Sequence, residues 1–196
     1  MSYRGGSHKQ SEGSLELSEA NCGFSYFLTG SYLRNELGID NPIATKNAIQ
    51  DTTAQAKGFG YLSYLLGNDS RLSFLFGTTD NKFQIPNVPG QFPSFTLDGA
   101  PNIKSENIDA RQREKNQFQI LSYQGTGATG VDYQVSVFHR YTDVNYRPDP
   151  IADLTFNGIA ANILRRNETI GTQDDLSYQV NREHTLRTGL FYSHEQ

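Results

Sequence analysis

The chain has 196 residues, of which 36% are hydrophobic and 12% are aromatic, with 11 Tyr, 12 Phe and no Trp. Its formal net charge of −4 argues against a general nucleic-acid binder, because such proteins carry a concentrated basic surface. The single Cys22 excludes an internal disulfide scaffold. Strand-forming aromatic residues beside many polar residues instead favour an all-β protein whose strands have one apolar and one polar face.

Eight extended segments are predicted, because apolar and polar residues alternate along them with a period of two. In the segment 71–80, for example, Leu72, Phe74 and Phe76 alternate with Arg71 and Ser73. The predicted segments, in chain order, are 8–18, 23–34, 53–66, 71–80, 115–124, 131–144, 167–180 and 184–193. The first twelve residues, 1–12, are expected to include disorder.

The connections between these segments alternate in length. Short joins at 19–22, 67–70, 125–130 and 181–183 are separated by long polar connections at 35–51, 81–114 and 145–166. Successive connections of an up-and-down meander emerge at opposite ends, so the short joins gather at one rim and the long ones at the other. Outer-membrane barrels have this pattern, with short periplasmic turns and long extracellular loops. The sequence therefore predicts an antiparallel meander of about eight strands that forms part of an outer-membrane-type β-barrel.

One motif in the join at 125–130 imitates a cofactor site. Gly125, Gly127 and Gly130 have the G-x-G-x-x-G spacing of a dinucleotide-binding loop, which requires a helix after its last glycine. A strand pattern, 131–144, follows instead, so a hairpin connection is predicted. The four histidines are scattered, and no nucleophile motif is present. We therefore predict no catalytic residues, no metal ligands, no cofactor and no enzyme activity.

Three segments resemble barrel strands of TonB-dependent outer-membrane receptors: GFSYFLTGSY at 23–32, RLSFLFG at 71–77 and HTLRTGLF at 184–191. The resemblance implies that residues 1–196 form a partial barrel domain without the receptor's plug. It also implies the outer membrane of a Gram-negative bacterium as the location. The implied partners are a small-molecule ligand such as a metal chelate (siderophore) or another nutrient, the lipid bilayer, and the TonB system acting through a plug outside this chain. No nucleic-acid partner is expected.

The long connections are the candidate ligand sites, because loops on a rigid barrel commonly carry recognition. Phe92 and Phe95 would present rings to a ligand, whereas Arg111 and Arg113, or Tyr146 and Arg147, would meet an anionic group. The alternative for the aromatic residues is that they pack the loop against its neighbours. The alternative for the whole chain is a soluble secreted β-repeat, propeller-like binding protein, since the short turns recur about every 50 residues.

Overall fold

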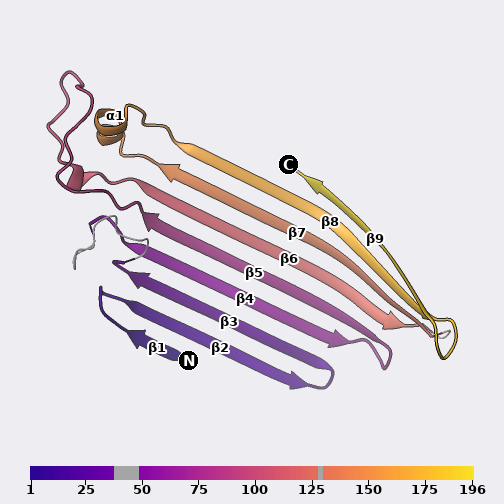
Figure 1. The fold of residues 1–196 in the computed structure, drawn as a ribbon. Coiled ribbons are helices and arrows are strands. Elements are labelled where there is room, and N and C mark those ends of the chain that lie inside the picture. The colour runs from indigo at the N-terminus through magenta and orange to yellow at the C-terminus, as the bar shows by residue number, and fades with distance from the viewer. Residues whose placement is uncertain (38–48, 128–129) are drawn as a thin grey trace.

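The fold is one antiparallel sheet in which each strand pairs with its neighbour in sequence (Figure 1). The computed structural model describes residues 1–37, 49–127 and 130–196. The strands are β1 (Ser2–Gly5), β2 (Ser11–Asn21), β3 (Phe24–Asn35), β4 (Thr53–Leu65), β5 (Ser70–Gln84), β6 (Arg111–Thr126), β7 (Val131–Arg147), β8 (Ile163–Gln179) and β9 (Thr185–Glu195). The predicted all-β, up-and-down antiparallel meander is confirmed.

The short turns after β2, β4, β6 and β8 lie at one rim of the sheet (Figure 1). The long connections after β3, β5 and β7 lie at the opposite rim, together with the five-residue join of β1 and β2. The tightest is the join of β2 and β3, where Cys22 and Gly23 both have positive φ, 46° and 84°, as a type I′ hairpin turn requires. Of the predicted connections, residues 38–48 and 128–129 lie outside the described residues. We name the edge at which β2, β4, β6 and β8 end the short-turn rim, and the edge at which β3, β5 and β7 end the long-loop rim.

Strands extend further toward the long-loop rim than the sequence pattern indicates. The segments predicted at 71–80 and 115–124 are parts of β5 and β6, whose pairing continues to Gln84 and Arg111. Apart from Phe83, polar residues fill this added part of the ladder, so period-two hydrophobicity does not reveal it. The short β1, which pairs with the start of β2, was not predicted and brings the number of strands within the described residues to nine.

The two faces of the sheet differ in chemistry. One continuous cross-strand row contains Tyr26, Leu62, Phe74, Leu121 and Val137. We name this side the apolar face. The adjacent row, which points to the opposite side, contains Ser25, Ser63, Ser73, Ser122 and Ser136. We name that side the mixed face, because it also carries phenylalanines.

Phenylalanines on the mixed face cover glycines of the neighbouring strands. Phe118 Cζ lies 2.6 Å from the position that a Cβ of Gly77 would occupy, and a ring carbon of Phe138 lies 2.5 Å from that of Gly171. The Phe138 ring also stacks on Phe191, with ring centroids 5.7 Å apart and planes inclined by 14°. Aromatic residues on the mixed face therefore fill the space above glycines, which have no side chain of their own.

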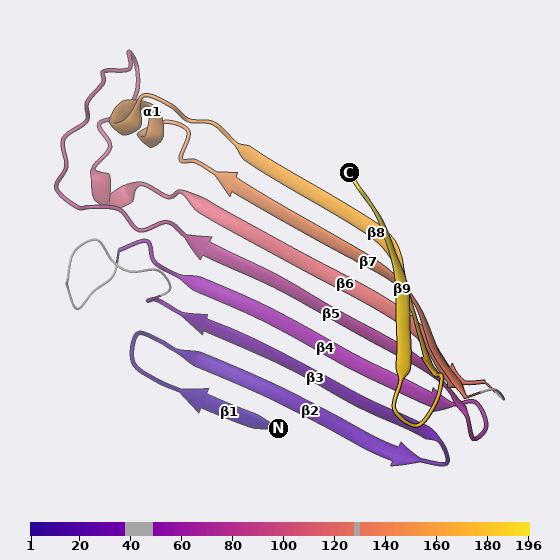
Figure 2. The ribbon, with the colours of Figure 1, turned by 45° about the vertical axis from the view of Figure 1, so that its right-hand side comes forward.

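The sheet has almost no covered core of its own. It twists and curls toward β9 (Figure 2), and within the described residues β1 and β9 are its two edges. Of the residues that the structure describes, the buried hydrophobic ones are Ile108, Ala110 and Ala152, all near the long-loop rim. On the apolar face, Leu121 and Val137 are 43% and 50% exposed. A propeller divides into four-stranded blades, which this single nine-stranded sheet does not do.

Candidate functional site

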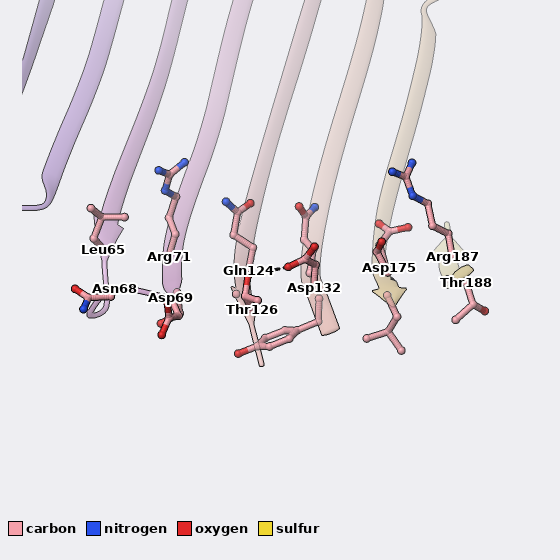
Figure 3. A pocket seen from close by; sticks show the side chains of 17 residues that line it. Leu65, Asn68, Asp69, Arg71, Gln124, Thr126, Asp132, Asp175, Arg187 and Thr188 are labelled. Carbon is pink, nitrogen blue, oxygen red and sulfur yellow. Dashed lines mark hydrogen bonds between the residues drawn. The ribbon is translucent and has the colours of Figure 1, made fainter. Parts of the chain in front are cut away.

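A polar hollow of about 840 Å³ lies on the mixed face at the short-turn rim (Figure 3). Its wall is built from strand residues that the antiparallel register brings side by side: Arg71 on β5, Gln124 on β6, Gln134 on β7, Asp175 on β8 and Arg187 on β9. These residues are far apart in sequence. The register of five consecutive strands places these side chains on the same face of the sheet, and this forms the wall of the hollow.

The hollow combines both signs of charge with hydrogen-bonding groups. Asp132 accepts a hydrogen bond of 2.7 Å from Thr126 Oγ1, and below it Ser122 and Ser136 share one of 2.9 Å. Arg71 Nε is buried and has no hydrogen-bond acceptor among the described residues. A buried donor without an acceptor is costly, so this surface suits a partner that supplies oxygen acceptors.

A second structured region lies at the long-loop rim, where the connection 85–110 packs against α1 (Ala152–Asn157). Thr155 O accepts backbone hydrogen bonds from Ser94 N and Phe95 N, at 3.0 and 2.9 Å. The same connection contains a short 3-10 helix, η1 (Ser105–Asn107), whose Ser105 is fully buried and accepts a hydrogen bond from Gln91 N at 3.0 Å. We name residues 85–110 and 148–162 the loop module.

Asp149 joins the two halves of the loop module. Its carboxylate accepts hydrogen bonds from the backbone N–H groups of Ile151 at 3.2 Å, Ala152 at 3.0 Å and Asp109 at 3.3 Å. Asp153 Oδ2 accepts the reciprocal bond from Asp149 N at 2.9 Å. Asp149 therefore caps the first turn of α1 as an N-cap aspartate does, and it also holds the chain just before β6.

Asp109 is held by the neighbouring arginine. Arg111 Nε donates to both of its carboxylate oxygens, at 2.8 and 3.0 Å, and Gln84 Nε2 donates at 3.2 Å. The Arg111 hydrogen bond is the main reason that the pKa of Asp109 lies below its usual value, and Gln84 adds to the effect. Because the folded-state pKa is lowered, this contribution to stability is complete above pH about 4 and is lost as the pH falls through the lowered value.

The structure separates the predicted ligand residues into three places. Phe92 is 91% exposed at the surface of the loop module, and Phe95, 54% exposed, lies against Gly158 at the end of α1. We expected the other four residues in loops, which was wrong: Arg111 and Arg113 begin β6, and Tyr146 and Arg147 end β7. The two aromatic residues and the other four do not form a single site.

The four strand residues also lie on different faces of the sheet. Arg111, Arg113 and Arg147 lie on the apolar face, whereas Tyr146 lies on the mixed face opposite Gln112. Arg113 Nε donates to Asp80 Oδ1 at 2.8 Å, so a cross-strand ion pair already occupies this arginine. Tyr146 and Arg147 therefore cannot contact one ligand from the same side of the sheet.

The described residues contain no group of three or more His, Cys, Asp and Glu side chains that could hold a metal ion. His139 is engaged on both ring nitrogens, with Gln119 Oε1 at 2.7 Å from Nδ1 and Glu168 Oε1 at 2.8 Å from Nε2. In the same described part of the chain, no helix is long and apolar enough to cross a membrane.

Comparison of the sequence with protein-family models and with curated proteins found no match.

Replacing Asp149 by alanine is expected to loosen the loop module while leaving the sheet intact. The change removes a cap that receives three backbone N–H groups, and such caps contribute about 1–2 kcal/mol. Limited proteolysis should then cut within 85–110 and 148–162 faster than in the unchanged protein. Asp98→Ala is the matched control, because Asp98 is an exposed carboxylate of the same connection. Equal cleavage of the two variants would contradict the role given to Asp149.

Proposed function

We infer that this chain is a wall segment of an outer-membrane β-barrel that takes up a small ligand in the manner of TonB-dependent receptors. The observation that carries the inference is the meander itself: its turns are short at one rim, three of the four connections at the other rim are long, and one of its faces exposes large apolar side chains. Outer-membrane barrels combine these two features, because they have short periplasmic turns, long outer loops and an outward-facing apolar band.

The apolar face needs a non-aqueous neighbour. Its central row from Tyr26 to Val137 crosses five strands, and each exposed Å² of apolar surface costs about 25 cal/mol in water. A lipid bilayer covers such a face without any partner protein. It also demands that every backbone group in the wall be paired, a demand that a continuous antiparallel ladder meets across its interior strands.

The mixed face then lines the lumen. Its serine row and the polar hollow around Arg71 and Asp175 suit contact with water, ligand or a plug. The loop module stands at the outer entrance, where the exposed Phe92 is available to a ligand. In this proposal the ligand is a small nutrient such as a metal chelate, and energy reaches the barrel from the TonB system through the receptor's plug.

A pair of tryptophan variants tests the membrane part of the proposal. The natural chain has no Trp, so Leu121→Trp and Ile120→Trp each introduce a sole tryptophan, and the two adjacent positions face opposite sides of the sheet. In phosphatidylcholine vesicles with brominated acyl chains, Leu121→Trp should lose most of its fluorescence and Ile120→Trp should keep most of it. Equal quenching of both, or of neither, would refute a lipid-facing apolar face.

Phe74→Trp and Leu75→Trp repeat the comparison on β5, so the result does not depend on one site.

The transport part has its own test in cells that carry the full parent protein. Uptake of radioactive iron supplied as hydroxamate, catecholate or carboxylate chelates should fall on deletion of the gene and on collapse of the proton-motive force. Unchanged uptake of all three classes would remove metal chelates from the proposal, whatever the fluorescence result.

A further inference from the structure

A basic cluster lies on the apolar face near the long-loop rim. Seven cationic side chains from five strands line a shallow hollow of about 670 Å³, in which Asp143 is the single carboxylate: Arg34, Lys82, Arg111, Arg113, Lys115, Arg147 and Arg166. These side chains share one face because cross-strand pairing aligns them, as in the row Arg34, Ala54, Lys82 and Arg113.

Part of this charge is neutralised within the sheet. Arg111 pairs with Asp109, Arg113 with Asp80, and Arg166 with Asp143 at 2.8 Å. Among the described residues, no carboxylate lies within 4.0 Å of the cationic groups of Arg34, Lys82, Lys115 or Arg147. The whole chain has a net charge of −4, so four cations on one patch that have no direct ionic partner within the described residues are a marked local excess.

The position of the basic cluster relates it to the apolar band. On β3 the same face carries Leu28, Tyr32 and then Arg34; on β5 it carries Phe76 and, six residues later, Lys82. A strand rises about 3.3 Å per residue, so Arg34 follows Tyr32 by about 7 Å and Lys82 follows Phe76 by about 20 Å. Apolar surface followed by positive charge along the same strands matches a molecule with apolar chains and an anionic head.

We propose that the basic cluster binds the phosphate-bearing headgroup of an anionic membrane lipid whose acyl chains lie on the apolar face. The inference rests on the proposed function, since it needs the apolar face to contact a bilayer. Arg34, Lys82 and Arg147 are exposed and supply positive charge to the phosphate. Lys115 lies between Asp80 and Asp143 in the cross-strand register. A nutrient in the lumen would be on the other side of the sheet, so these side chains serve the lipid.

The test uses the full chain with Tyr32→Trp, a sole tryptophan on the apolar face that lines the hollow. Vesicles of phosphatidylcholine contain a small fraction of one brominated lipid, either phosphatidylcholine or phosphatidic acid. Quenching by the brominated phosphatidic acid should be stronger at equal mole fraction. Adding Arg34→Gln, Lys82→Gln and Arg147→Gln together should reduce this preference by about tenfold or more, because each surface cation near an anionic lipid contributes about 1 kcal/mol.

The matched control replaces Lys57, Arg140 and Arg165 by glutamine. These are also two arginines and one lysine, all exposed, but they lie on the mixed face. The control should keep the preference, and equal loss in both triple variants would overturn the proposal by making the effect one of total charge. Equal quenching by both brominated lipids would overturn it too, as would abolition of the preference by millimolar inorganic phosphate, which would indicate a site for a soluble anion. Absence of quenching by either lipid, together with an unquenched Leu121→Trp, would instead identify failure of the proposed function.

Discussion

Replacing Gly171 by alanine is expected to lower the free energy of unfolding by about 3 kcal/mol, because overpacking of this kind costs about 1–3 kcal/mol and here involves the backbone. The new Cβ would collide with the carbonyl oxygen of Tyr192 on β9 and lie 2.5 Å from a ring carbon of Phe138. The ring can rotate away, but the carbonyl belongs to the β8–β9 ladder and cannot move without opening it.

Urea unfolding in detergent micelles, followed by far-ultraviolet circular dichroism, measures this loss. Hydrogen exchange should locate it, with β9 amides losing protection before those of β5 and β6. Gly13→Ala is the control, because a Cβ at Gly13 meets nothing within 4 Å, and alanine in a strand is favoured over glycine by about 0.5–1 kcal/mol. Two glycine substitutions in one sheet should therefore change stability in opposite directions. Equal destabilisation by both would mean that the contact between β8 and β9 is not the cause.

The strands were predictable from the sequence wherever one face is apolar. The segment predicted at 131–144 matches β7 except for the last three residues of the strand, 145–147, because Val135 and Val137 alternate with polar neighbours. The pattern fails where both faces are polar, so the ends of β5 and β6 near the long-loop rim were missed. There the ladder is held by cross-strand pairs such as Asp80 with Arg113, which periodicity does not detect.

The helix α1 had local signals that the prediction did not use. Asp149 followed by Pro150 is a typical helix start, because aspartate caps the first turn and proline fits the first helical position. Gly158 follows the helix with a φ of 75°, as a C-terminal glycine does. The segment was instead predicted as part of one long polar connection, because α1 is too short to establish a helical period.

The polar hollow and the basic cluster were not predictable from residue spacing. Each requires knowledge of which residues face one another across several strands, and a shift of register by one residue would reverse every face. Arg34, Lys82 and Arg147 belong to three different strands, and in the sequence the basic residues look dispersed. Their convergence depends on strand pairing that the local pattern does not specify, so the strands were predictable from the sequence and the two surfaces were not.

Replacing Leu121 by lysine is expected to destabilise the protein by about 2–4 kcal/mol in a lipid bilayer, the cost of a lysine near the middle of a barrel's lipid-facing band. Leu121 lies between Phe74 and Val137 in the cross-strand row, so no carboxylate stands directly beside it on β5 or β7 to pair with the new charge. Because Leu121 is already 43% exposed, the same change in a water-solvated sheet should cost far less, about 0.5 kcal/mol as for an ordinary surface substitution. The membrane proposal thus predicts a penalty that depends on the solvent.

Leu97→Lys supplies the comparison, because Leu97 is 42% exposed and lies in the loop module, outside the apolar band. Urea unfolding of both variants should be measured in phosphatidylcholine vesicles and again in a short-chain detergent whose micelles admit water more readily. Leu121→Lys should lose stability mainly in the vesicles, whereas Leu97→Lys should behave alike in both. If the two lysines were tolerated equally in vesicles, the apolar face would not lie in hydrocarbon, and a protein partner would have to cover it instead. The difference in stability loss between the two lysine variants therefore reports whether the apolar face lies in hydrocarbon, separately from the general cost of adding a charge.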